Sequence, residues 1–365
     1  MKASRKRILI CGVLPPPTFG HSKMYEMLMA SSFPKEFDIR FLNMNFWSYQ
    51  TNQKVTGNKV LKMLGYYGQF VWDIVTFRPE YVLYNASFYP MPFLKDLLFC
   101  VTGIVLGRKV VMHDMGQYAR ELHDRLPRWQ AALLRWQLRR TAASILVGEA
   151  VKPAYAGLMP PEKLFPAGIA VEDTQPLRVE AARKPGLNVL FFSFMSVPKG
   201  IFVAFDVARR VLGEDAACRF TFGGGIESEP VGQALAQLQK DFPGRIVHLG
   251  HIEDIHARTR MFREADVFIF TTLRDASGLV LLHAMAEGLP IVASREGTIP
   301  EIVAEGENGL LFDKGDAPAC AARVMRLLAD AGLRLRMAAC SRRRFEEAYT
   351  AEKYGAAMAR IFEKI

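Results

Sequence analysis

The clearest chemical pattern in the sequence lies between residues 265 and 312. A strand-like apolar run ends at Thr272, a polar loop containing Asp275 follows, and Ser277 and Gly278 begin a run of helical character. The first turn of a helix presents unpaired backbone N–H groups at the positive end of the helix dipole, where a phosphate binds well. The pattern therefore predicts an anion site at Ser277 and Gly278, although many α/β proteins contain a similar helix start.

An ordered series of short motifs surrounds this predicted helix start. It reads Gly278-Leu279-Val280, Ala284-Met285-Ala286, Gly288, Pro290, Val292-Ala293-Ser294, Gly297, Pro300-Glu301-Ile302-Val303 and Asn308-Gly309-Leu310-Leu311. The segments before it are Phe165-Pro166-Ala167-Gly168-Ile169, Pro198-Lys199-Gly200, Phe222-Gly223-Gly224-Gly225 and Val247-His248-Leu249-Gly250. In this order the motifs resemble those of the retaining glycosyltransferases of the glycogen-synthase-like group, called family 4. The resemblance implies the GT-B fold, in which two Rossmann-like, doubly wound parallel-sheet domains face a central cleft.

The resemblance also implies a nucleotide-sugar donor site in the second half of the chain. The residues it assigns to donor binding are Lys199 and Gly200 at the diphosphate, Ser277, Gly278 and Leu279 at the helix start, His283 at the ribose, and His251 and Ile252 at the base. It places Asp275 in a catalytic position beside the transferred sugar. An ordinary solvated lysine is the alternative for Lys199, and a polar residue on a half-buried helix is the alternative for His283.

Three positions depart from the family pattern. Asp275 and His283 stand eight residues apart, where the family has two glutamates. Aspartate keeps the charge with a shorter reach, whereas a neutral imidazole accepts one hydrogen bond and donates one. Phe194 stands where the family often has an arginine, which leaves Lys199 and backbone amides to hold the diphosphate. These changes indicate either a divergent or a weakened donor pocket.

The first half offers two weaker candidates for the site. Gly20 and His21 lie in the loop 15–22, between a predicted strand and a helix expected to begin near Lys23. This loop resembles the family's glycine-containing loop that faces the acceptor and the donor phosphates, and glycine permits close backbone approach. His113 ends a predicted strand where relatives keep a histidine near the transferred sugar, so the resemblance implies a catalytic role. The alternatives are an exposed loop histidine for His21 and a strand-end turn for His113.

A predicted helix over residues 128–140 carries a basic stripe. It comprises Arg128, Arg135 and Arg139 at i, i+7 and i+11, and Trp129 and Trp136 lie on the neighbouring stripe. Cations beside tryptophans are typical of a helix at a membrane interface. Residues 54–72 form a second segment of this kind, with lysines followed by aromatic residues. The alternative is that the aromatic residues belong to the core and the arginines to a solvated face.

The charge of the chain is unevenly distributed. Lys and Arg number 47 and Asp and Glu 37, a formal net charge of +10. Residues 1–170 contain 22 basic and 11 acidic residues, and the remainder contains 25 and 26. Because no nucleic-acid-binding motif is present, we expect the basic excess to meet an anionic membrane surface rather than nucleic acid.

The length and composition predict two packed α/β domains. The chain has 365 residues, half of them hydrophobic, which excludes a disordered protein. The expected strands are 8–13, 37–42, 81–84, 109–113 and 144–147, followed by 188–193, 218–223, 245–249, 267–270 and 291–294. We expect a first domain over 1–175, a linker over 176–186, a donor domain over 187–348, and a terminal helix over 349–365 that packs back on the first domain. The apolar run near the start is interpreted as a buried strand rather than a signal peptide, and the five scattered cysteines as core residues of a protein from a reducing compartment.

Taken with the resemblance, these features predict a retaining, metal-independent glycosyltransferase with no cofactor. The expected donor is a UDP-, GDP- or ADP-sugar, and the expected acceptor is a lipid-linked or cell-envelope saccharide. No apolar stretch reaches the roughly 20 residues of a membrane span, so we expect a cytoplasmic protein peripheral to the inner face of the membrane. The alternatives are a transferase with a soluble acceptor and a catalytically weak protein that only binds nucleotide-sugars.

Overall fold

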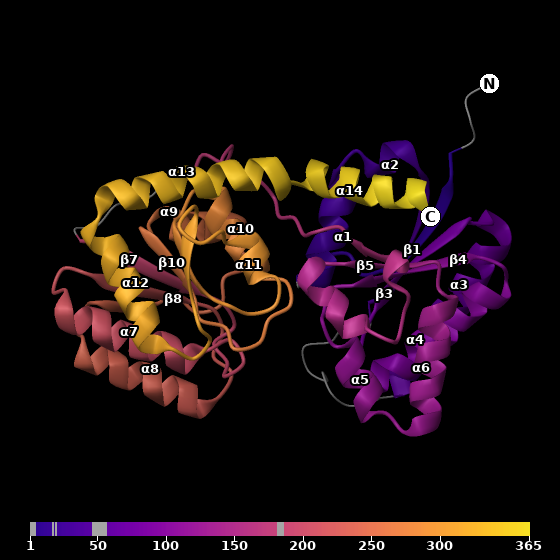
Figure 1. Cartoon of the computed structure of the whole chain (residues 1–365), viewed down its shortest axis with the longest axis horizontal. Coiled ribbons are helices and arrows are strands. Elements are labelled where there is room, and N and C mark those ends of the chain that lie inside the picture. Colours follow the sequence, from indigo (N-terminus) through magenta and orange to yellow (C-terminus); the bar gives the residue numbers. More distant parts are fainter. Residues whose placement is uncertain (1–4, 17, 19, 46–56, 181–185) are drawn as a thin grey trace. The chain divides into compact units, whose positions relative to one another are not determined.

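The computed structural model describes residues 5–16, 18, 20–45, 57–180 and 186–365 (Figure 1). The chain divides into two compact units, the first formed by Met1–Ala170 and Ala351–Ile365 and the second by Val171–Thr350. The terminal helix α14 (Ala351–Lys364) therefore belongs to the first unit. Residues 171–175, which we expected in the first domain, belong to the second, and part of the expected linker 176–186 lies outside the described residues.

The first unit is built on a six-stranded parallel sheet. Its strands are β1 (Arg7–Gly12), β2 (Asp38–Asn43), β3 (Tyr81–Ala86), β4 (Lys109–Asp114), β5 (Ala143–Leu146) and β6 (Leu164–Pro166). They lie in the order β2-β1-β3-β4-β5-β6. Five were expected to within two residues at their ends, and the buried strand expected at 8–13 is the central β1. The sixth, β6, was not expected, since three residues ending in proline give no strand signal.

Helices cover both faces of this sheet. They are α1 (Gly20–Ala30), α2 (Phe33–Glu36), α3 (Gly57–Phe77), α4 (Pro90–Val105), α5 (Ala119–Arg125), α6 (Arg128–Arg140), η1 (Glu149–Tyr155), η2 (Pro161–Lys163) and α14. Right-handed crossovers that step in one direction from β2 to β5 place α3, α4 and α6 on the same face, and these helices are neighbours in the structure. The opposite face carries α1, with α2 and α14 packed beside it (Figure 1).

The second unit repeats the architecture. Its strands are β7 (Asn188–Phe192), β8 (Arg219–Gly223), β9 (Ile246–His248), β10 (Val267–Phe270), β11 (Ile291–Ser294) and β12 (Gly309–Phe312). Its helices are α7 (Ile201–Glu214), α8 (Glu229–Asp241), α9 (Ile255–Arg263), α10 (Leu279–Ala286), α11 (Ile299–Ile302), α12 (Ala317–Ala329) and α13 (Ala331–Ala348). The strand order is β12-β11-β10-β7-β8-β9. After β7 the chain forms β8 and β9 on one side of β7, and it then returns to form β10 on the other side of β7. In such sheets the crevice at this switch point is the usual ligand site.

The expectation of two doubly wound, Rossmann-like parallel-sheet domains is confirmed. The interior follows the apolar strand patterns, and all five cysteines are buried and unpaired, as expected for core residues. Within the described part of the chain, no helix combines the length and the hydropathy that crossing a membrane requires.

Candidate functional site

The loops that follow β7 and β10 meet at the switch point of the second sheet. The carbonyl oxygen of Pro198 accepts hydrogen bonds from the backbone N–H of Leu273 at 2.9 Å and of Arg274 at 3.0 Å. The buried hydroxyl of Thr271 donates to the carbonyl oxygen of Gly200 at 2.9 Å. Because these bonds join two loops more than 70 residues apart in sequence, they fix the position of Lys199 relative to the start of α10.

Gly200 is required at the start of α7. Its φ is +69°, a region that residues with a Cβ rarely adopt. A Cβ at this position would lie 1.7 Å from the carbonyl oxygen of Thr271. The two loops can approach this closely only because residue 200 has no side chain.

We expect Gly200→Ala to destabilise the second unit by about 1–3 kcal/mol and to weaken anion binding, since the loop carrying Lys199 must move. Gly244→Ala is the matched control, because Gly244 has a φ of +71° but no atom within 4 Å of the added Cβ. Urea unfolding followed by far-UV circular dichroism measures both variants. Equal losses of stability would show that backbone strain alone, and not the collision with Thr271, accounts for the effect.

Three hydrogen-bond donors converge on one carboxylate at this site. The Lys199 Nζ lies 2.6 Å from Asp275 Oδ2. Asp275 Oδ1 accepts from the backbone N–H groups of Ser277 at 3.2 Å and Gly278 at 3.3 Å. We call the Lys199 ammonium and these two amides the anion cradle. It combines one positive charge with oriented N–H groups, an arrangement that suits a phosphate, and here Asp275 occupies it.

Buried hydroxyl groups support the loop that carries the cradle. Ser294 Oγ donates to the carbonyl oxygen of Thr272 at 2.7 Å, and Thr298 Oγ1 donates to that of Ala276 at 2.8 Å. Thr272, Ser294 and Thr298 are each at most 2 % exposed. Sequence reasoning named Thr272 as a strand end and Ser294 as part of a motif, but it gave neither a supporting role and did not name Thr298. The sequence feature that could have revealed them is a Ser or Thr at or beyond the carboxyl end of an apolar strand, where its hydroxyl group can donate a hydrogen bond to the neighbouring loop.

The other predicted donor residues lie at the same edge of the sheet or nearby. His283 is half-buried within α10, and its ring centroid is 6.2 Å from that of Phe262 in α9. His251 and Ile252 follow β9, and the exposed His251 ring pairs with Glu253 at 3.1 Å. The strands are parallel, so this loop shares the carboxyl edge with Lys199, two strands away. Leu279 is the first residue of α10.

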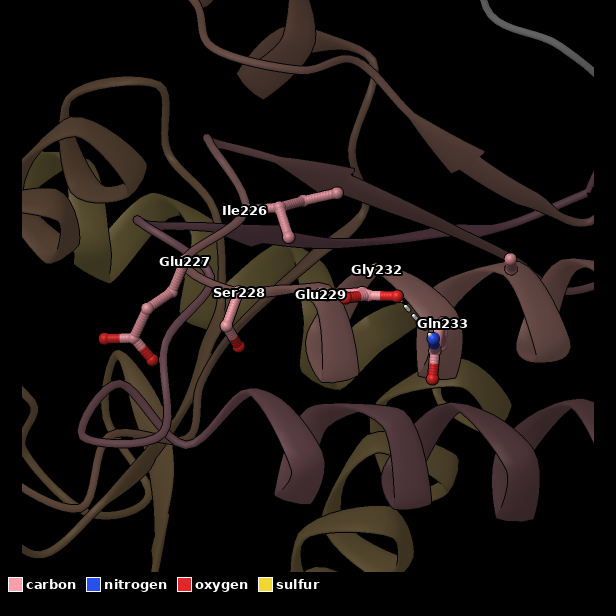
Figure 2. Close-up of a pocket in the computed structure, with 7 residues that line it drawn as sticks. Ile226, Glu227, Ser228, Glu229, Gly232 and Gln233 are labelled. Atoms are coloured by element: carbon pink, nitrogen blue, oxygen red, sulfur yellow. Dashed lines mark hydrogen bonds between the residues drawn. The ribbon is translucent and has the colours of Figure 1, made fainter.

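An open pocket of about 580 Å³ lies beside the start of α8 rather than at the cradle (Figure 2). Glu227 and Glu229 line it, and Glu229 accepts a hydrogen bond from Gln233 at 3.0 Å. The Glu227 carboxylate accepts the backbone N–H of Val197, which holds the Lys199 loop from its other side. Two carboxylates make this pocket a poor place for a phosphate, so we assign the anion site to the cradle.

His113 lies near the end of β4, and its side chain is buried in the interior of the first unit. Its side chain is 2 % exposed, and its ring nitrogens face the hydroxyls of Tyr25 at 3.3 Å and Tyr354 at 3.1 Å. Burial, with a smaller contribution from nearby His21, lowers the pKa of His113 to about 3. A neutral ring with both nitrogens paired has none left for a ligand. In this arrangement His113 joins β4 to α1 and α14, and its contact with the transferred sugar stays a prediction.

The remaining predicted residues of the first unit lie on its helices. Gly20 begins α1, three residues earlier than the helix expected near Lys23, and His21 follows it as a partly buried residue. Burial lowers the pKa of His21. In α6, Trp129 is 62 % and Trp136 is 39 % exposed. Arg128, Arg135 and Arg139 are exposed as well. The alternative in which these tryptophans belong to the core is therefore wrong.

The fold and this site define the class of the protein. Two Rossmann-like parallel-sheet units, the second with an anion cradle at its switch point, correspond to the GT-B fold of glycosyltransferases. Residues 186–330, less than half of the chain, match the family described as glycosyl transferases group 1. The resemblance to glycosyltransferases that the motifs indicated is confirmed for this segment, and membership of family 4 stays a prediction. Among the described residues, no group of three or more His, Cys, Asp or Glu side chains could hold a metal ion.

Several known proteins are similar to this chain. WcaL of Salmonella typhimurium, named as a colanic acid biosynthesis glycosyltransferase, is 25% identical over 233 residues, which cover 61% of this chain and 55% of WcaL. AmsK of Erwinia amylovora, an amylovoran biosynthesis glycosyltransferase, is 30% identical over 177 residues, which cover 46% of this chain and 42% of AmsK. The crystal structure of Anabaena HepE in complex with UDP matches this chain with a TM-score of 0.73 at 15% sequence identity. The match covers 99% of this chain and 100% of the HepE chain. The chain thus spans about half the length of these curated relatives and shares its whole fold with HepE.

Proposed function

We propose that this protein transfers a sugar from a nucleotide-sugar to a hydroxyl group of a saccharide acceptor. The observation that carries the proposal is the anion cradle at the switch point of a group 1 glycosyltransferase domain. When the bond between the sugar and the diphosphate breaks, negative charge builds on the leaving phosphate oxygens. A lysine and two fixed backbone N–H groups stabilise charge at that place without having to reorganise.

The proposed role of each residue follows from its place around the cradle. The diphosphate would bind to Lys199, Ser277 and Gly278 and so displace the Asp275 carboxylate, which then becomes available to a hydroxyl of the donor sugar. His283 would contact the ribose, and the loop at His251 and Ile252 the base. We further propose retention of configuration, with a donor phosphate oxygen accepting the proton of the acceptor hydroxyl. Because Lys199 and the amides neutralise the leaving group, the proposed reaction needs neither a metal ion nor a cofactor.

UDP-sugars are the first donors to test. HepE, which shares the fold, was crystallised with UDP and with UDP-glucose. Isothermal titration calorimetry of the full chain with UDP, GDP and ADP, and then with their sugar conjugates, would identify the base and the sugar. Binding of at least one nucleotide-sugar, followed by its turnover with an acceptor, is the expected result. Absence of binding by every member of the panel would contradict the proposed function.

We propose a lipid-linked or cell-envelope saccharide as the acceptor, presented at the cytoplasmic face of a membrane. WcaL and AmsK are named for the biosynthesis of colanic acid and amylovoran, and the basic excess of the chain lies in residues 1–170. A soluble acceptor remains the second candidate, which turnover with free sugars or sugar phosphates would favour. A protein that only binds the donor is the third. It is favoured by the exposed Phe194, which stands where the family often has an arginine and leaves Lys199 as the cation of the cradle, and by His283, which stands where the family has a glutamate.

A further inference from the structure

The outer surface of the first unit carries an apolar stripe along α3. Leu61 is 68 %, Leu64 56 %, Trp72 63 % and Val75 57 % exposed. With Gly68 their spacings are three, four, four and three residues, so they form one line along the helix. A helix of 21 residues extends for roughly 30 Å. Apolar residues in a continuous line on the solvent side, opposite the face packed on the sheet, mark an interaction surface.

The neighbouring helices α4 and α6 continue this surface. On α4, Leu94 is 49 %, Leu98 39 % and Val105 75 % exposed, at spacings of four and seven residues. On α6, Trp129 and Trp136 are exposed on one side of the helix, seven residues apart. Because α4 contacts both α3 and α6 on the same face of the sheet, the three helices that carry these stripes are neighbours. We call this surface the α3/α4/α6 face (Figure 1).

The charges on these helices identify the partner. The only acidic residues within the described helices α3, α4 and α6 are Asp73 and Asp96. Both are 3 % exposed and are paired inside the unit, with Arg40 at 3.0 Å and with Lys95 at 2.5 Å. The exposed charges on the three helices are therefore cationic, and α6 alone provides four arginines. Apolar rows, tryptophans and cations, on three described helices that themselves carry no exposed carboxylate, are complementary to an anionic lipid headgroup layer.

We propose that the α3/α4/α6 face docks on an anionic lipid bilayer, with the apolar rows and tryptophans inserted among the headgroups and the α6 arginines against lipid phosphates. This deepens the proposed function, since it provides the surface at which a lipid-linked acceptor is presented. The docking itself needs no nucleotide and no catalysis. It is therefore testable on the full chain whether or not a donor binds.

Flotation with phosphatidylcholine vesicles, with and without about one-third phosphatidylglycerol, tests the proposal at low salt and at about 0.5 M salt. The full chain is expected to float with anionic vesicles, much less with neutral ones, and to be released by salt. All four tryptophans belong to residues 1–170, so their emission should shift to shorter wavelengths on docking. Leu61→Gln combined with Trp129→Gln should lower the partition coefficient at least about tenfold, because two exposed apolar anchors are lost.

Leu335→Gln is the matched control, since Leu335 is 72 % exposed on α13 of the second unit. It should leave vesicle binding unchanged. Absence of flotation with anionic vesicles at low salt, or equal losses in the double variant and in the control, would overturn the proposal. Self-association of the chain that the double variant abolishes, without vesicle binding, would instead assign the face to a second copy. Calorimetry with the panel of UDP, GDP and ADP and their sugar conjugates separates the two proposals. Vesicle binding without binding of any member of the panel contradicts the proposed function alone, and the reverse contradicts the docking proposal alone.

Discussion

Asp275→Asn is expected to tighten the binding of UDP about tenfold, whereas Lys199→Ala should weaken it by one to two orders of magnitude. The Asp275 carboxylate now takes all three donors of the cradle, so UDP must displace it before the diphosphate can bind. Asparagine retains the oxygen that accepts from Ser277 and Gly278 but removes the competing charge. Since the Lys199 side chain is 30 % exposed, solvent screening limits the gain to about this size.

Isothermal titration calorimetry with UDP, which has no sugar, measures the competition without any contribution from a contact between Asp275 and the sugar. Asp316→Asn is the matched control, because Asp316 accepts the backbone N–H of Ala319 at the start of α12 in the same unit. It should leave UDP binding unchanged. Weaker UDP binding in Asp275→Asn would mean that the carboxylate positions the cradle and does not compete with phosphate. With a UDP-sugar, Asp275→Asn should lose turnover even as the affinity for UDP rises.

His113 is expected to make the first unit sensitive to acid. The pKa of this buried ring is about 3 in the folded protein, against about 6.5 for a histidine in an unfolded chain. Below pH 6.5 the unfolded state binds a proton that the folded state excludes, so the folded state loses stability as the pH falls from 6.5 towards 3. Between pH 7.5 and 5.0 the loss due to His113 should be about 2 kcal/mol.

His113→Gln tests this prediction, because glutamine can still bond the hydroxyls of Tyr25 and Tyr354 but does not titrate. Urea unfolding followed by tryptophan emission reports the first unit alone, since the second unit contains no tryptophan. The wild type should lose about 2 kcal/mol more than the variant over this pH range. The neighbouring Asp114 acts in the opposite direction, because burial raises its pKa to about 6. It is common to both proteins and cancels in the comparison. Equal pH dependence would show that His113 is accessible to protons in the folded state.

Most of the secondary structure could be predicted from local patterns. Ten of the strands are short apolar runs between turn residues, and the edge strand β6, with three residues, gave no such signal. The last strand, β12 (Gly309–Phe312), was noticed only as part of a motif. The start of α1 was expected too late, because Gly20 and His21 have the composition of a loop. Local sequence propensity predicts an element least well where the helix or strand is short or begins with glycine.

The sequence by itself determined which segments form most of the two sheets, because strand ends and helix starts are local properties of the chain. Through the family resemblance, the order of its motifs also predicted that Lys199, Ser277 and Gly278 form one anion site. Only the tertiary structure decided which groups pair. Asp275 meets Lys199 across 76 residues, and Tyr354 covers His113 across 241. It also decided that Trp129 and Trp136 face outward while Asp73 and Asp96 are buried. The physical reason is that burial and pairing depend on which surfaces the folded chain brings together, and a residue's sequence neighbours do not specify them.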